Sequence, residues 1–162
     1  MGVKRFGNWA EAKQLLTNGL DQRLVLAIRQ ATVKNALLLV REIKRGIRDQ
    51  APGGKQFPPL AQVTIDRKGS SKALIDTGFL LNSITQKILS DRAFVGLLRT
   101  SFYKDGENAA NIGAIMEYGC TIKHPSGAVI VIPPRPFLHP TMEKYRNEVI
   151  NNYREALASV LK

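Results

Sequence analysis

The chain has 162 residues, of which 44% are hydrophobic and 23% charged, and its formal net charge is +11. This composition is typical of a globular domain and excludes a disordered or fibrous chain. The single cysteine, Cys120, excludes an intrachain disulfide. No apolar run approaches the roughly eighteen residues that a membrane span needs, and the N-terminus lacks the apolar stretch of a signal peptide. We therefore expect a folded protein that is made in the cytoplasm and contacts no membrane.

The positive charge is concentrated towards the N-terminus. Residues 1–52 hold ten Lys/Arg against four Asp/Glu, whereas residues 93–162 hold eight against six. Such an excess permits contact with nucleic-acid phosphates, but a solvated helix face has the same composition. Nucleic-acid binding therefore stays open.

A long helix is predicted over residues 20–48, because apolar side chains recur there at helical spacing without proline. At the rise of an α-helix it would be about 40 Å long, more than a small sheet requires. The run at 37–40 (LLLV) places apolar side chains on more than one face. We expect Leu37, Leu38 and Val40 to contact another subunit.

Residues 53–73 are predicted to form an extended loop arm. They mix Pro, Gly, Ser and Lys with few apolar anchors, among them Phe57 and Leu60. Loops of this length in compact domains are normally functional or disordered. We expect the arm to order against a neighbouring subunit through Phe57 and Leu60.

Strands and a second helix follow. Residues 83–90 and 92–98 predict an antiparallel pair, and residues 128–134, after a turn at 124–127, predict a second hairpin packed on the first. Residues 140–162 predict an amphipathic helix that lies on the sheet. The expected fold class is α+β: a small antiparallel sheet packed by a long N-terminal helix and a C-terminal helix. It forms one domain over residues 20–162, after an extension at 1–19.

Asp76-Thr77-Gly78 has two interpretations. An aspartic protease needs two such loops with paired carboxylates, and the chain has one, followed by the bulky Phe79. The favoured alternative is a cap, in which Asp76 or Thr77 accepts from the free N–H groups of a helical turn. In that case Leu80 and Ile84 pack the turn against the core.

Cys120, His124 and His139 are the remaining candidates for a nucleophile and base or for metal ligands. Their spacing matches no established zinc pattern, and no third group orients a thiolate. Scattered polar residues are the favoured interpretation, and we expect no catalytic residue, metal or cofactor.

Glu117 and Arg135 each lie in an apolar neighbourhood, where a charge is costly unless it is paired. Three interpretations stay open. The two side chains form one partly buried ion pair, or each pairs with a charge across a subunit boundary, or both are exposed at loop ends.

Several segments in chain order resemble one family: Ala51-Pro52, residues 74–84 (LIDTGFLLNSI), 115–119 (IMEYG) and 132–138 (IPPRPFL), followed by the C-terminal helix. They resemble the tail-completion and virion-morphogenesis family of tailed bacteriophages, which are minor tail or head–tail neck proteins. The likeness spans residues 20–162 and departs from the family pattern at residues 111–114. The residues that carry it are Asp76, Thr77, Gly78, Leu80, Ile84, Glu117, Gly119, Arg135, Pro136 and Phe137.

The resemblance implies a non-enzymatic virion subunit. It implies a homo-oligomeric ring of six or twelve copies in the neck or at the top of the tail, which joins the DNA-filled head to the tail. Implied partners are the head connector or adaptor and the tail terminator or tube proteins, with passing contact to packaged DNA. The alternative is a DNA-binding module that uses the Arg/Lys-rich first helix.

Overall fold

The computed structural model describes residues 20–89, 92–123, 125, 127 and 129–160. The fold is α+β, as the sequence predicts. Its elements in chain order are α2 (Leu20–Arg48), η2 (Pro52–Gly54), α3 (Gln62–Lys68), α4 (Phe79–Ser83), β1 (Ile84–Ile88), β2 (Ala93–Leu97), α5 (Ala109–Tyr118), β3 (Cys120–Lys123), β4 (Val129–Ile132) and α6 (His139–Val160).

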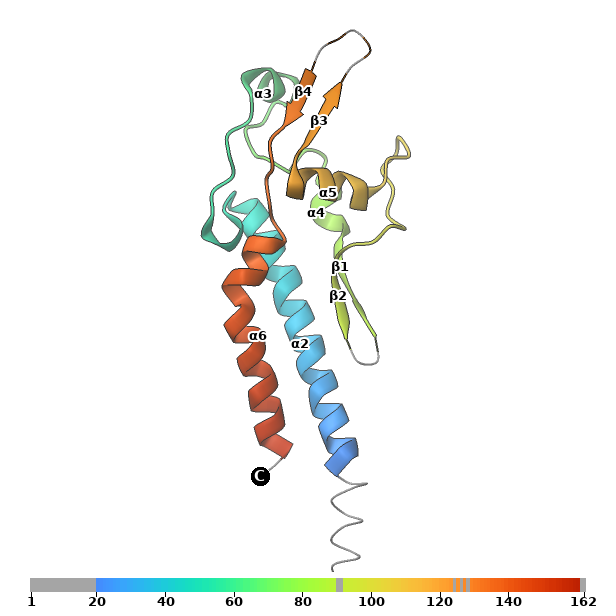
Figure 1. Ribbon diagram of the computed structural model, residues 1–162, viewed down its shortest axis with the longest axis vertical. Coiled ribbons are helices and arrows are strands. Elements are labelled where there is room, and N and C mark those ends of the chain that lie inside the picture. The colour runs from blue at the N-terminus through green and yellow to red at the C-terminus, as the bar shows by residue number, and fades with distance from the viewer. Residues whose placement is uncertain (1–19, 90–91, 124, 126, 128, 161–162) are drawn as a thin grey trace, which may run out of the picture.

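The two long helices, α2 and α6, lie side by side and antiparallel (Figure 1). The prediction that the C-terminal helix lies on the sheet is wrong, because α6 packs mainly along α2. Length explains this: α6 has 22 residues and is about 33 Å long, whereas a five-residue strand spans about 17 Å. Only α2 is long enough to cover the apolar side of α6.

Polar side chains also join α2 to α6. Asn152 donates to Asn35 (2.7 Å), and the hydroxyls of Thr32 and Tyr153 lie 2.9 Å apart. The Tyr145 hydroxyl donates to the buried Glu42 carboxylate at 2.7 Å. That bond is the largest of the effects that lower the pKa of Glu42, and it also raises the pKa of Tyr145. Because each of these bonds fits only one alignment of the helices, they fix the register of the pair.

The first hairpin, β1–β2, packs on α2 beside α6. Its strands are antiparallel, with Ile84 opposite Leu97 and Gln86 opposite Val95. Ile84 and Leu97 share one face and are buried, as strand alternation requires for the face that points at the core. The hairpin thereby covers the side of α2 that α6 leaves open.

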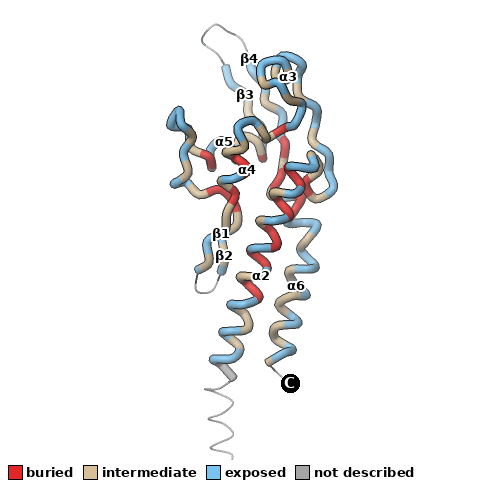
Figure 2. The backbone as a smooth tube through the Cα atoms, turned by 180° about the vertical axis from the view of Figure 1, so that it is seen from behind, coloured by how far each residue is buried: buried red, intermediate tan, exposed pale blue. Residues whose placement is uncertain are grey.

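The core gathers at one end of the helix pair, and the other ends of α2 and α6 are largely exposed (Figure 2). It forms where the C-terminal half of α2 meets α4, α5, the first hairpin and the start of α6. The buried apolar residues are Ile43, Ile47, Leu80, Leu81, Ile84, Leu97, Ala109 and Phe137.

The second hairpin, β3–β4, stands apart from the first. The prediction that it packs on the first hairpin is wrong, since each hairpin is a separate two-stranded sheet and α5 lies between them (Figure 1). Gly119 starts the hairpin with φ of 74°, and a Cβ there would lie 2.8 Å from the Ile132 carbonyl oxygen. Glycine is therefore required where α5 turns into β3 against the end of β4.

The loop arm at 53–73 is attached to its own subunit and contains the short helix α3. The Gln50 side chain closes its base, because it donates to the Ala73 carbonyl (3.1 Å) and accepts from the Ala73 N–H (2.5 Å). The Phe57 N–H donates to the Gln50 carbonyl at 2.9 Å, and its ring packs on the core. The arm therefore folds back on the domain.

Candidate assembly surface

The Asp76-Thr77-Gly78 segment caps the short helix α4, but through Thr77. The Thr77 hydroxyl accepts from the Phe79 N–H at 3.3 Å, and Gly78, with φ of 80°, is the N-terminal cap residue. Asp76 is exposed and supplies no cap bond, so of the two predicted acceptors Thr77 is right and Asp76 is wrong. Gly78, in the left-handed region, is the N-terminal cap residue of α4, and the first helical N–H, that of Phe79, is bound by the Thr77 hydroxyl.

Glu117 is buried, at 7% exposed, and holds the start of α6. Its carboxylate accepts the backbone N–H groups of Phe137 (2.8 Å), Leu138 (3.0 Å) and His139 (2.9 Å). The first N–H groups of a helix have no partner inside the helix, and a negative charge is favourable beside them. Glu117 therefore joins α5 to α6 by charge-assisted bonds.

Arg135 is also buried, at 6% exposed, and holds the loop arm. Its guanidinium donates to the carbonyls of Pro58 (3.3 Å) and Pro59 (3.0 Å), while its backbone N–H donates to the Met116 carbonyl (2.7 Å). Burial lowers the pKa of the Arg135 guanidinium, which stays charged at neutral pH. Pro136 follows it, half-buried, and leads to the fully buried Phe137.

No ion pair joins Glu117 to Arg135 in the part of the chain that the structure describes, so the predicted pair is wrong. The alternative of two exposed charges is wrong as well, since both side chains are buried. Backbone groups within the subunit satisfy both: helix N–H groups for the carboxylate and proline carbonyls for the guanidinium. Both residues therefore stabilise the junction between α5, the arm and α6.

The predicted nucleophile or metal candidates do not form a site. His124 lies outside the described residues, Cys120 is half-buried on β3, and His139 is exposed and lies 3.9 Å from Glu143. Over residues 20–89, 92–123, 125, 127 and 129–160, no group of three or more His, Cys, Asp or Glu side chains is placed to hold a metal ion.

Most of the predicted subunit contacts are used within the subunit. Leu38 is buried, and Val40 and Phe57 pack against the core, so these predictions need correction. Leu37 is 52% exposed and Leu60 is half-buried, so they stay candidates. The predictions failed because the arm and the first hairpin of the same chain cover faces of α2. The sequence alone does not show which segments cover those faces.

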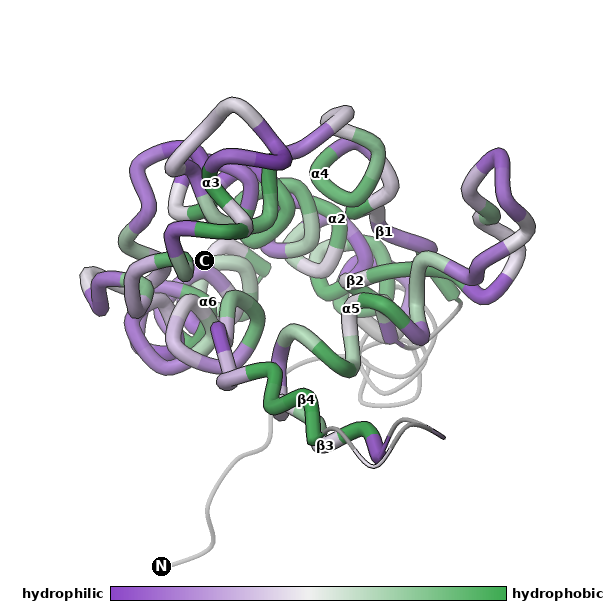
Figure 3. Tube along the Cα trace, turned by 90° about the horizontal axis from the view of Figure 1, so that it is seen from above, coloured by the Kyte–Doolittle hydropathy of each residue, from purple (hydrophilic) through white to green (hydrophobic). Residues whose placement is uncertain are grey.

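The hairpin β3–β4 exposes an apolar surface that sequence reasoning missed. Figure 3 shows β4 as a hydrophobic segment at the edge of the molecule, paired with the mixed strand β3. Ile122, Val129, Ile130 and Val131 are between 45% and 66% exposed. Such clusters of exposed branched side chains mark interaction sites. A β-branched run predicts a strand equally well whether it is covered by its own chain or by another molecule, so the sequence alone did not distinguish the two.

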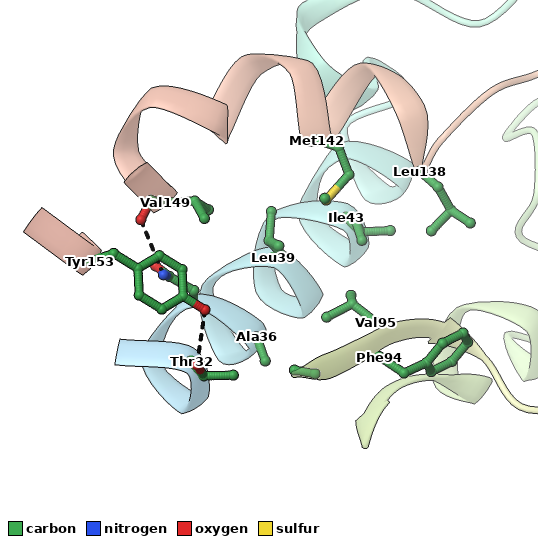
Figure 4. Close-up of a pocket in the computed structure, with 12 residues that line it drawn as sticks. Thr32, Ala36, Leu39, Ile43, Phe94, Val95, Leu138, Met142, Val149 and Tyr153 are labelled. Carbon is green, nitrogen blue, oxygen red and sulfur yellow. Dashed lines mark hydrogen bonds between the residues drawn. The ribbon is translucent and has the colours of Figure 1, made fainter. Parts of the chain in front are cut away.

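A second exposed apolar feature is an open trough between α6 and β2, with α2 as its floor (Figure 4). It encloses a cavity of about 370 Å³. Its walls are apolar: Leu39 and Ile43 from α2, Phe94 and Val95 from β2, Met142 and Val149 from α6. Thr32 and Tyr153, joined by their hydroxyls, lie at one end.

A basic stripe runs along the outer face of α2. Its members are exposed and recur at intervals of 11, 7, 4 and 3 residues, which places them on one side of a helix: Arg23, Lys34, Arg41, Arg45 and Arg48. The stripe is about 38 Å long. Acidic partners are few, namely Glu42 at 2.8 Å from Arg41 and Asp49 at 3.5 Å from Arg45.

Comparisons with protein-family models, curated proteins and solved structures each found no match to this chain. Within the described residues, none of the helices combines the length and apolarity that crossing a membrane would demand.

Proposed function

We propose that this protein is a non-enzymatic structural subunit of a tailed-phage virion, which forms a ring in the neck or at the top of the tail and joins the DNA-filled head to the tail. The observation that carries the proposal is the hairpin β3–β4, whose four exposed branched side chains bury no core of their own. An isolated two-stranded hairpin is only marginally stable in water, so a surface that covers it adds stability as well as contact.

The residues that carry the family resemblance support this proposal. Glu117, Gly119 and Arg135 all lie at the base of the hairpin. Glu117 and Arg135 bind backbone groups there, and Gly119 permits the close approach of the Ile132 carbonyl. They make the junction rigid and present the hairpin in one orientation. Such a role suits an assembly subunit, whose work is done by surfaces. On this proposal the partners are further copies, in a ring of six or twelve, with the head connector or adaptor on one side and the tail terminator or tube on the other.

Deletion of the gene from the phage or prophage that carries it tests the proposal. We expect DNA-filled heads and separate tails to accumulate, and the wild-type chain supplied in trans to restore joined particles. A chain with Ile122→Lys and Ile130→Lys on the hairpin should fold, because both side chains are exposed, yet fail to restore joining. Joined, infectious particles that lack this chain would refute the proposal.

The basic stripe on α2 favours a second candidate, a duplex-DNA-binding module. It predicts binding whose logarithmic affinity falls linearly with the logarithm of the salt concentration. Replacement of Arg23, Lys34 and Arg48 by Gln should reduce that slope by about 3, since each phosphate that a basic side chain neutralises adds roughly 0.9. Replacement of Lys87, Lys104 and Lys123 by Gln removes the same charge elsewhere and is the matched control. Absence of binding at low salt would exclude this candidate.

A further inference from the structure

The two faces of the hairpin β3–β4 differ. Ile122 lies opposite Ile130, and Cys120 opposite Ile132, so these four side chains share one wholly apolar face. The other face carries Thr121 and Lys123 beside two valines. Neither strand pairs with any further strand in the described residues, so both outer edges keep unpaired backbone groups. We call the first surface the isoleucine face.

The trough has matching properties. A second cavity, of about 180 Å³, adjoins it and shares Phe94, Val95 and Leu138, so the hollow continues along β2 towards α5. β2 pairs only with β1, and its other edge makes no backbone hydrogen bond in the described part of the chain. An apolar floor beside an unpaired strand edge is the arrangement that accepts an added strand or hairpin.

The hairpin does not reach the trough of its own subunit. It starts at the end of α5 and points away from the helix pair, whereas β1–β2 lies on the opposite side of α5 (Figures 1 and 2). The trough is lined by residues of α2, β2 and the start and middle of α6, none of them on the hairpin β3–β4. Gly119 permits the turn from α5 into β3, and Arg135 ties the chain after β4 to the loop arm. Both surfaces are apolar, and on one chain they cannot meet, so a contact between them requires two copies.

We propose that the isoleucine face of one copy closes the trough of the next copy, with Ile122 and Ile130 inserted over Leu39 and Phe94. The contact is head-to-tail, and repeated head-to-tail contacts close into rings or run on as filaments. This inference rests on the proposed function, since it requires that copies of the chain assemble, and it names the surfaces that do so.

The size of the contact argues for a second copy as the occupant. The hairpin has four residue pairs, so one face measures about 13 Å by 10 Å. A standard complex covers about 800 Å² on each partner, several times that footprint. One such contact is thus too small to be stable alone. In a closed ring each copy makes two contacts, as donor and as acceptor, and closure makes the last contact intramolecular, which favours repeated copies of this chain over a single foreign partner at this face.

Disulfide trapping tests the contact directly. In a Cys120→Ser background, Ile130→Cys and Met142→Cys place one thiol on the isoleucine face and one on the trough rim, at positions that are 48% and 47% exposed. Oxidation of the concentrated full-length protein should give a ladder of linked chains on a non-reducing gel. Val131→Cys with Met142→Cys is the matched control, on the more exposed opposite face, and should give several times less linked product.

Mixing the two single-cysteine chains sharpens the result, because a head-to-tail contact then gives linked heterodimers and no ladder. A ladder of equal yield from Val131→Cys, or a link confined to single chains, would overturn the inference. Light scattering of the same samples measures self-association. Self-association without the ladder overturns this contact, and so does the absence of self-association. The proposed function is tested separately by the deletion of the gene.

Discussion

Glu117→Ala is the most informative single change, because it removes the carboxylate that holds the start of α6. Three backbone N–H groups, at 2.8 to 3.0 Å, would lose their acceptor. The first belongs to Phe137, which is fully buried, so water does not replace the missing bond there without opening the core. The expected result is a folded but clearly less stable domain.

The magnitude follows from these contacts. An unsatisfied buried donor costs about 1–3 kcal/mol, and the two less buried donors recover part of their loss from water, so we expect about 4 kcal/mol in all. At about 2–4 °C per kcal/mol for a domain of this size, the melting temperature should fall by about 8–16 °C. Glu117→Gln keeps one acceptor oxygen but turns an amide N–H towards the donors, and should cost about 2 kcal/mol.

Urea denaturation followed by far-UV circular dichroism measures these losses, and hydrogen exchange should show faster exchange at Phe137, Leu138 and His139. Glu148→Ala, an exposed change on α6, is the control and should stay within about 0.5 kcal/mol of wild type. A loss below about 1 kcal/mol for Glu117→Ala, with exchange unchanged, would refute the role assigned to this carboxylate.

Three further predictions concern other contacts. Tyr145→Phe should cost about 1.5 kcal/mol near neutral pH, since it removes a bond to an ionised group. The lowered pKa of Glu42 stabilises the fold above its unfolded pKa of about 4.3, and the raised pKa of Tyr145 stabilises it below about 10. Denaturation across pH should therefore show the gap from wild type closing as pH falls below about 4 or rises above about 10; a constant gap would contradict this. Arg135→Lys should free the arm, seen as faster tryptic cleavage within residues 55–68, and unchanged cleavage would count against the clamp. Gly113→Ala should cost about 1–3 kcal/mol in thermal denaturation, because the new Cβ would lie 2.1 Å from Leu97 Cδ1; a neutral result would contradict that packing.

Local patterns predicted the elements well. Apolar spacing located α2 between residues 20 and 48, and β-rich runs located the first hairpin and β4, because these signals depend on neighbours in sequence. The strand β3 was implied only by the turn that precedes β4. The helix α3 within the arm was missed, because few apolar residues mark its seven positions.

Pairings between distant segments were predicted poorly. The sequence indicates that a buried Glu117 or Arg135 needs hydrogen-bonding partners, but it does not show which groups those partners are. A carboxylate is satisfied equally by a guanidinium or by backbone N–H groups at a helix start, and here those of Phe137, Leu138 and His139, at and just before the first residue of α6, bind it. The same limit applies to α6, whose apolar face fits a sheet or a helix until the lengths of both are compared.

The anchoring of the hairpin has a mechanical consequence. Ile132 ends β4, and only three residues later Arg135 is tied to the arm, followed by Phe137 and its bond to Glu117. Tension applied at the tip of β3–β4 would be borne first by these short, charge-assisted bonds, in line with the chain, before it reaches the helix pair. Subunits linked through this hairpin would then yield at the junction of α5 and α6 while α2 and its core stay intact.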